Sequence, residues 1–269
     1  MGNFRILHTA DNHIGLKFNN YGGTAAQSAL VQERFDALKN VVQASNDKDA
    51  HFLVVAGDLF DDLKVTQKDI KAVVEILKKS KAEVLVLPGN HDYYDGKENK
   101  LWKAFSDFAE NTNLKLLLNA TPYETEVDGT PVCFYPAPCG SKHHEGHVIG
   151  WVSDVAKSPE TIHIGLAHGN VEGMGVDDAD RYFNMSEGDL RAAGVDFWLL
   201  GHIHVPYPPT TAVGNPLFFM PATHTPESIK RKIPGYAWFI EVNEQKNLKF
   251  RQLTTGNLQF SRQVLQFGR

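Results

Sequence analysis

Five short motifs rich in aspartate, histidine and asparagine occur within the first 204 residues of this 269-residue chain. They are Asp11-Asn12-His13, Gly57-Asp58-Leu59-Phe60-Asp61, Gly89-Asn90-His91-Asp92, His168-Gly169-Asn170 and Gly201-His202-Ile203-His204. Their carboxylate, imidazole and amide groups are mixed oxygen and nitrogen ligands, which suit divalent Mn, Fe, Zn, Co or Ni. Neither cysteine of the chain lies in a motif, which argues against a structural zinc site of the cysteine type. The residue types therefore predict a site for divalent metal ions.

The spacing within two of the motifs supports this prediction. On an extended backbone, residues two positions apart point to the same side, within reach of one ion. Asp11 and His13 have this spacing, and so do His202 and His204. A helix cap or a loop hydrogen bond explains any single motif equally well. The occurrence of all five, each after a predicted strand, favours metal binding over a purely structural role.

The elements that must position these motifs can be predicted from the apolar pattern. Apolar segments that run into the motifs predict strands at residues 4–8, 52–56, 83–87, 161–167 and 196–200. Helical spacing of apolar residues predicts helices at residues 29–44, 69–79 and 101–109. Ligands of α/β sheets bind beyond the carboxyl ends of the strands. We therefore expect the five motifs to meet at one edge of the molecule.

The remaining segments complete an α/β fold. Short strands are predicted at residues 114–118, 123–127 and 132–135, with a hairpin turn at Asp128-Gly129. A closing antiparallel set is predicted at residues 217–220, 236–242 and 248–253. This order predicts a four-layer α/β/β/α sandwich, in which two mixed sheets pack together with helices on the outside. We expect a single domain over residues 1–269.

Bulk composition excludes some classes of protein. The net charge is -5 and the pI is about 6.2, so the chain lacks the basic surplus of a strong non-specific DNA-binding protein. No apolar run is long enough for a transmembrane helix, and the first residues do not resemble a signal peptide. We expect a cytoplasmic protein without membrane association. Cys133 and Cys139 are expected to be free thiols rather than a disulfide.

The five motifs resemble the calcineurin-like metallophosphoesterase superfamily, whose pattern is D-x-H, G-D, G-N-H-D/E, H and G-H-x-H. Within it, residues 6–11 and 56–61 are similar to the SbcD-like branch of DNA-repair exonucleases. SbcD-like nucleases continue into a DNA-capping domain and a segment that docks an ATPase. The resemblance here covers the phosphoesterase domain only, so we expect no capping domain and no ATPase partner.

The resemblance implies a role for each motif residue. Two divalent ions, with Mn preferred over Fe, Zn, Co or Ni, would share Asp58. The first ion would also bind Asp11, His13 and His204, and the second Asn90, His168 and His202. A metal-bound hydroxide would attack phosphorus, with His91 assisting the leaving group and Asp92 orienting His91 through a hydrogen bond.

The substrate is less well defined than the chemistry. The resemblance implies hydrolysis of phosphodiester bonds, with phosphomonoesters as a second option and nucleotides or single-stranded nucleic acid as candidate substrates. One alternative is an SbcD-like, manganese-dependent DNA exonuclease or endonuclease. Another is a non-catalytic binding or scaffold protein of the same fold, although the complete ligand set argues against it. The sequence leaves the oligomeric state open.

Three further residues or segments receive structural interpretations. Asp61 is expected to cap the helix that begins near Thr66 rather than to steer substrate. Arg34 is expected to form a surface ion pair on the first helix. The histidine-rich segment at residues 143–147 is expected to be an exposed loop without bound metal.

Overall fold

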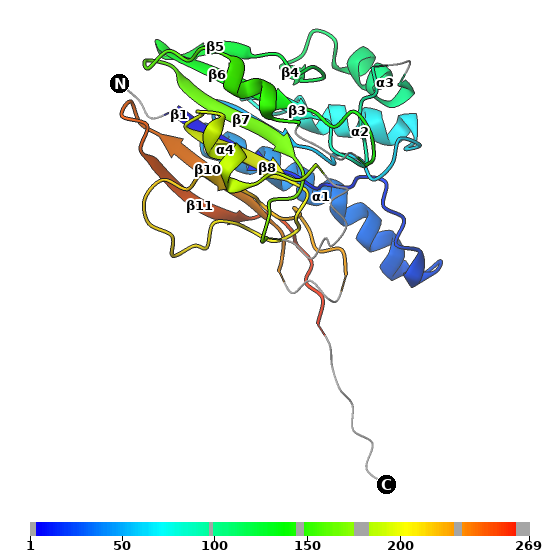
Figure 1. Cartoon of the computed structure of the whole chain (residues 1–269). Coiled ribbons are helices and arrows are strands. Elements are labelled where there is room, and N and C mark those ends of the chain that lie inside the picture. Colours follow the sequence, from blue (N-terminus) through cyan, green and yellow to red (C-terminus); the bar gives the residue numbers. More distant parts are fainter. Residues whose placement is uncertain (1–3, 97–98, 144–147, 175–182, 229–232, 262–269) are drawn as a thin grey trace.

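Two β-sheets packed face to face, with helices on both outer faces, form the body of the molecule (Figure 1). The computed structural model describes residues 4–96, 99–143, 148–174, 183–228 and 233–261. The histidine-rich segment that is expected to be a loop falls largely outside this range, because its residues 144–147 are not among those described.

The first sheet has the strand order β11-β10-β1-β2-β3-β4. Its parallel part consists of β1 (Phe4–Thr9), β2 (Phe52–Ala56), β3 (Glu83–Leu87) and β4 (Leu114–Leu116). The strands β10 (Tyr236–Val242) and β11 (Leu248–Thr254) are antiparallel additions beside β1. The parallel strands are connected by α1 (Ala25–Asp47), α2 (Gln67–Leu77) and α3 (Lys100–Ala109). Helix α1 begins earlier than predicted because the Thr24 side chain caps it by accepting the Gln27 N–H.

The second sheet has the order β5-β6-β7-β8-β9. Its strands are β5 (Tyr123–Val127), β6 (Thr130–Ala137), β7 (Ile162–His168), β8 (Phe197–Gly201) and β9 (Phe218–Phe219). The predicted Asp128-Gly129 hairpin joins β5 to β6, and both turn residues have positive φ, as such a turn requires. The other pairs are parallel. Short helices, η2 (Gly150–Asp154) and α4 (Glu187–Ala192), precede β7 and β8.

Alternating side chains divide the core into three layers, which confirms the predicted α/β/β/α sandwich. On β1, Ile6 points between the sheets, where it joins a cluster that includes Phe134 of β6. Its neighbour Leu7 points to the opposite face and packs with Leu38 of α1. On β8, Trp198 similarly faces outward and packs near Leu190 of α4. The central strands of each sheet are therefore buried on both faces, whereas the edge strands β5 and β11 are partly exposed.

The expected antiparallel set of three closing strands is wrong in one respect. Strand β9 pairs in parallel with β8 in the second sheet, whereas β10 and β11 extend the first. The apolar pattern could not distinguish these outcomes, because Phe218 and Phe219 are buried on opposite faces of the sheet that they join.

Two expectations from composition can be compared with the structure. Cys133 and Cys139 are both buried and unbridged, which confirms that they are free thiols. Among the described helices, none combines the length and the apolarity that crossing a membrane would require.

Candidate metal centre

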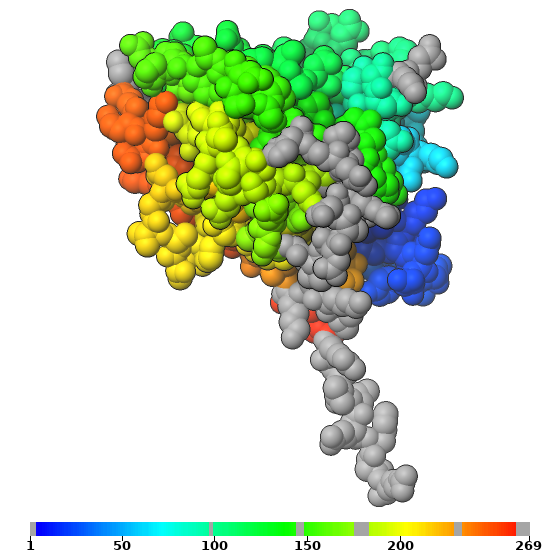
Figure 2. All heavy atoms as spheres, in the orientation of Figure 1, coloured from blue at the N-terminus to red at the C-terminus, as the bar shows by residue number. Residues whose placement is uncertain are grey.

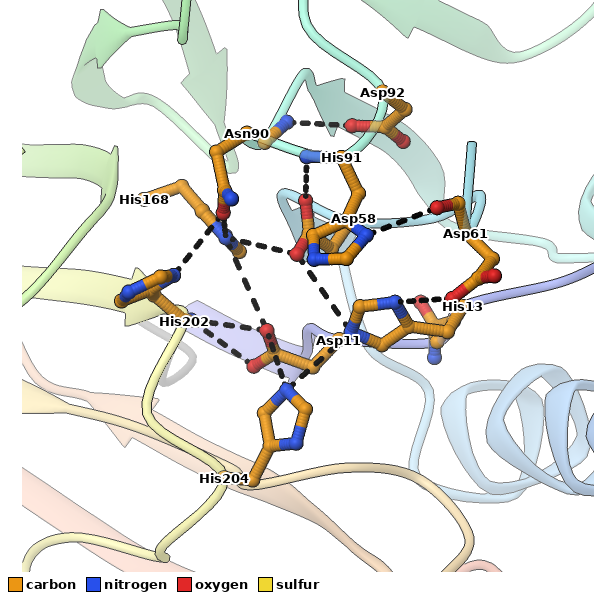
Figure 3. A network of polar contacts seen from close by, with 12 residues as sticks. Asp11, His13, Asp58, Asp61, Asn90, His91, Asp92, His168, His202 and His204 are labelled. Carbon is orange, nitrogen blue, oxygen red and sulfur yellow. Dashed lines mark hydrogen bonds and ion pairs between the residues drawn. The ribbon is translucent and has the colours of Figure 1, made fainter. Parts of the chain in front are cut away.

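The five motifs lie at the carboxyl ends of β1, β2, β3, β7 and β8, and their polar side chains converge on one another (Figure 3). Backbone hydrogen bonds align the first two loops: Asp11 N–H donates to Gly57 O at 3.1 Å, and His13 N–H donates to Asp58 O at 2.9 Å. In the second sheet, Gly169 N–H donates to Gly201 O at 3.3 Å. The structure thus brings together all seven side chains predicted as ligands: Asp11, His13, Asp58, Asn90, His168, His202 and His204.

Several of these residues have a backbone conformation that is unusual outside glycine. Asp11, His13 and Asp58 have φ values of 53°, 43° and 50°, and His202 has a φ of 100°. Non-glycine residues with positive φ are uncommon and cost on the order of 1–3 kcal/mol each, and they concentrate at functional sites. The side chains of these four residues meet in one cluster (Figure 3), so the unusual backbone conformations coincide with the candidate site.

The first group of ligands surrounds a point between His13 and His204. Their Nε2 atoms are 3.3 Å apart, the Asp11 carboxylate is 3.4 Å from His204 Nε2, and the Asp58 carboxylate is 3.6 Å from His13 Nε2. Metal bonds of roughly 2.0–2.2 Å place neighbouring ligand atoms about 3.0–3.4 Å apart. The spacing therefore fits one ion. Because both Nδ1 atoms face carboxylates, two ring nitrogens this close require a proton or a cation between them.

The second group is centred on Asn90. Its side-chain oxygen lies 3.1 Å from His168 Nε2 and 3.1 Å from His202 Nδ1, and His168 Nε2 lies 3.2 Å from the Asp58 carboxylate. The His168 Nδ1 atom donates to the Ala56 carbonyl at 2.9 Å, which directs its Nε2 atom toward the two oxygens. The same Oδ2 atom of Asp58 lies near His13 and His168, so Asp58 stands between the two groups.

The electrostatics of the cluster favour positive charge. Burial alone would raise the pKa values of Asp11 and Asp58, but the nearby imidazoles, His204 and His168 foremost, hold both below their usual range. Burial would lower the pKa of His204, but the Asp11 and Glu227 carboxylates raise it to about 10. Two fully buried carboxylates therefore remain ionised and demand compensating cations, which protons or metal ions can provide.

His91 lies at the border of the cluster and is only partly buried. Its backbone N–H donates to the Asp58 carboxylate at 2.8 Å, and its ring Nδ1 lies 2.9 Å from the Asp61 carbonyl oxygen. The His91 ring also meets the His13 ring edge to face, with centroids 4.7 Å apart. A donated Nδ1–H fixes the ring orientation and leaves Nε2 as the atom that can exchange a proton with a substrate.

The predicted partner of His91 is not the one that the structure has. Both carboxylate oxygens of Asp92 accept backbone N–H groups, from Gly89 at 2.7 Å and from Phe60 at 3.0 Å. Burial and the charge of Asp58 raise the pKa of Asp92 to about 7, against the lowering effect of these hydrogen bonds. Asp92 thus ties together the loops after β2 and β3, while the Asp61 carbonyl orients His91.

Asp61 also differs from its predicted role as a helix cap. Helix α2 is capped by Thr66, whose hydroxyl accepts the Asp69 N–H. The Asp61 carboxylate instead lies 3.2 Å from His13 Nδ1. Asp61 therefore holds one predicted ligand with its side chain and the predicted acid, His91, with its backbone.

Arg34 is buried rather than at the surface as predicted, and Glu227, which no motif indicated, contacts the cluster. Arg34 is 1% exposed and donates to the Asn12 carbonyl at 2.7 Å. Glu227 lies 3.0 Å from His204 Nδ1 through one carboxylate oxygen and 3.7 Å from Arg34 Nη2 through the other. The spacing of Leu30, Arg34 and Leu38 on one helical face could have indicated burial of Arg34. No comparable pattern surrounds Glu227.

Comparison with known proteins connects this site to a family. Residues 4–206 match the family described as calcineurin-like phosphoesterase. The chain is 26% identical over 209 residues to the uncharacterized metallophosphoesterase YhaO of Bacillus subtilis (strain 168), and the match covers 74% of this chain and 48% of that protein. The chain therefore spans about half the length of the curated relative that it matches.

Solved structures share the fold at low sequence identity. A protein described as GAP50, the anchor in the inner membrane complex of Plasmodium, is 13% identical, with a TM-score of 0.57 over 96% of this chain and 86% of that chain. A dimetal phosphatase from Danio rerio is 10% identical, with a TM-score of 0.52 over 95% of this chain and 100% of that chain. These similarities concern the fold alone. The match over residues 4–206 shows that the chain belongs to the calcineurin-like phosphoesterase family.

Proposed function

We propose that this protein is a binuclear, metal-dependent phosphoesterase that hydrolyses phosphodiester bonds. The observation that carries the proposal is the convergence of two donor groups on a shared carboxylate, Asp58. Donor atoms within the two groups lie 3.1–3.6 Å apart, as ligands of two ions would. Asp11, His13 and His204 would hold one ion, and Asn90, His168 and His202 the other.

The ions, with Mn preferred among Mn, Fe, Zn, Co and Ni, would polarise the phosphoryl group and acidify a water molecule. The protein supplies the remaining functions. His91 stands beside the donor cluster with its Nδ1 held by the Asp61 carbonyl, so a protonated Nε2 can donate to the leaving oxygen. Positioned acid catalysis of this kind contributes roughly 10²–10⁴-fold to a rate.

The main alternative is a non-catalytic binding protein. The fold occurs in a protein described as an anchor as well as in a dimetal phosphatase, so fold alone does not decide between them. Hydrolysis would use the buried carboxylates and imidazoles as metal ligands, whereas a scaffold does not require such a cluster. A DNA nuclease remains the alternative within enzymes, although a net charge of -5 favours a smaller substrate.

The test begins with metal-free protein reloaded with Mn. We expect two ions per chain and turnover of bis-p-nitrophenyl phosphate, with p-nitrophenyl phosphate and single-stranded DNA as comparison substrates. Asp58→Asn should lose metal and activity together. His91→Asn should keep metal and lose activity by about 10²–10⁴-fold.

His51→Asn is the matched control, since His51 directly precedes β2 and pairs with Asp128 of the distant hairpin. It should change neither metal content nor turnover. Failure of the wild type to bind metal, or unchanged turnover in His91→Asn, would contradict the proposal. Metal binding without hydrolysis of any substrate would support the scaffold alternative.

A further inference from the structure

A cavity of about 850 Å³ opens beside the candidate metal centre. One wall is formed by residues 15–21 after the first motif, and the other by residues 61–69 after the second. Asp61 and Glu227 line the cavity and also contact the predicted ligands His13 and His204. The volume lies in the range of roughly 300–1,000 Å³ that is usual for small-molecule sites. The cavity therefore borders the predicted metal centre through Asp61 and Glu227, and it is large enough for part of a substrate.

The walls of this cavity are held together rather than open. Gly15 has a φ of +102°, and a Cβ at this position would lie 2.7 Å from Val65 Cγ1, so the two walls touch there. Asp61 N–H donates to Ile14 O at 3.0 Å, which adds a backbone tie. Phe18 lies beneath the guanidinium of buried Arg34, 5.3 Å from its ring centroid. A preformed site of this kind binds without a large ordering cost.

The cavity lining combines aromatic and cationic groups. The rings of Phe18 and Tyr21 meet edge to face at 6.4 Å. The segment that carries both rings includes η1 (Asn19–Tyr21) and leads into α1. It forms the blue projection at the right of Figure 2. Lys17 and Lys64 are exposed wall residues that form no ion pair with any described carboxylate. The wall can therefore bind a flat ring and a separate anionic group.

The charge balance limits the size of the substrate. The carboxylates of Asp61 and Glu227 are occupied by imidazoles of the metal centre. Asp62 and Asp69 also line the cavity, and they offset the two lysines. Among the residues that the structure describes, the wall thus carries no positive surplus that would attract a long polyanion, and binding of long nucleic acid depends on such a surplus. A single additional phosphate does not need a positive surplus over the whole wall, because it can lie next to the two lysines alone.

We propose that this cavity binds the leaving nucleotide of a short phosphodiester, such as a dinucleotide. The base of the leaving nucleotide would contact Tyr21, and the terminal phosphate of that nucleotide would lie near Lys17 and Lys64. The carbonyl of Asp61, a residue of the cavity wall, holds His91 beside the predicted ligand His13, where His91 would protonate the leaving oxygen. This inference rests on the proposed phosphodiesterase function and names its substrate class.

The experiment compares three small diesters: a dinucleotide with a terminal phosphate on the leaving nucleoside, the same dinucleotide without it, and an analogue that lacks the leaving base. Lys17→Gln/Lys64→Gln should raise KM about tenfold for the first substrate only. Tyr21→Ala should raise KM about tenfold for both base-containing substrates, in line with the usual contribution of stacking, and leave kcat unchanged. Lys103→Gln, on the exposed face of α3, is the matched control.

Binding of a nucleoside monophosphate to metal-free protein, measured by calorimetry, provides a readout that does not depend on turnover. We expect both cavity variants to weaken it about tenfold. Equal KM changes for all three diesters, or nucleoside monophosphate binding unaffected by both variants, would overturn the inference. So would a higher kcat/KM for a long single-stranded DNA than for the dinucleotide. Hydrolysis of bis-p-nitrophenyl phosphate without these preferences would refute the cavity assignment and leave the proposed function intact.

Discussion

Replacement of Glu227 by glutamine tests how the structure supports its candidate metal centre. One oxygen of Glu227 lies 3.0 Å from His204 Nδ1, and the other lies 3.9 Å from His13 Nε2. Burial by itself would raise the pKa of Glu227, but the hydrogen bond and charge of His204 hold it at about 2. Glu227 is therefore ionised at neutral pH. It contacts predicted ligands of the first ion and none of those assigned to the second.

The size of the effect follows from the change in one hydrogen bond. Glutamine keeps an acceptor for the His204 N–H but removes the charge. A hydrogen bond to a charged group contributes about 1.5–3 kcal/mol and a neutral one about 0.5–1.5 kcal/mol. A loss of about 1.4 kcal/mol corresponds to tenfold weaker binding of the first ion. Changes to the partners of metal ligands commonly cost 10–100-fold in affinity, so about tenfold is a modest expectation.

Titration of metal-free protein with Mn, followed by calorimetry, measures this difference. We expect wild-type protein to bind two ions, and Glu227→Gln to bind one of them about tenfold more weakly. Glu187→Gln is the matched control, because Glu187 forms an exposed pair with Arg191 on α4. Urea denaturation of both variants checks that the fold is retained. Equal weakening of both ions, or no weakening of either, would refute the assignment of Glu227 to the first site.

Two further predictions concern the loops and the buried histidines. Gly57→Ala should disrupt the centre and lower metal content, because a Cβ there would lie 2.1 Å from His168 Nδ1. Gly129→Ala is the control, since Gly129 has a similar φ of +82° and open space around it. It should cost only about 1–2 kcal/mol in the free energy of unfolding and leave metal content unchanged. Equal effects of the two changes would rule out the collision. Burial, with the charge of Arg34, lowers the pKa of His224 to about 3 in the folded protein. As pH drops below about 6.5, His224 is therefore protonated in the unfolded chain but not in the folded one, and the free energy of unfolding should fall. His224→Asn should flatten this fall by up to about 1.4 kcal/mol per pH unit between pH 6.5 and 4.5, measured by urea denaturation of metal-free protein, and an unchanged slope would contradict the reasoning.

Much of the architecture could be predicted because local pattern and tertiary environment agree. Strands such as Phe52–Ala56 are buried on both faces, and their sequences are therefore continuous apolar runs. Each motif residue follows such a run, and parallel strands bring their carboxyl ends to one edge. The convergence of Asp11, Asp58 and Asn90 follows from that rule alone.

Other features depend on contacts that local pattern does not encode. Strand β9 is two residues long, and its sheet is decided by which neighbour offers a free edge. Asp61 and Asp92 are both acidic residues near His91, and only loop geometry decides that the Asp61 carbonyl contacts the ring while Asp92 binds Gly89 and Phe60. Hydrogen-bond partners are selected by distances of a few tenths of an ångström, which sequence spacing does not specify.

The sequence by itself determined which side chains could bind metal and that they would meet at one edge of two sheets. Tertiary structure alone decided what supports them. Glu227 reaches His204 from 23 residues away, and Arg34 contacts Asn12 from a distance of 22 residues in the chain. Such partners carry no motif, because a buried charge needs only an opposite charge or a carbonyl nearby in space, and any segment that folds back to the site can supply it.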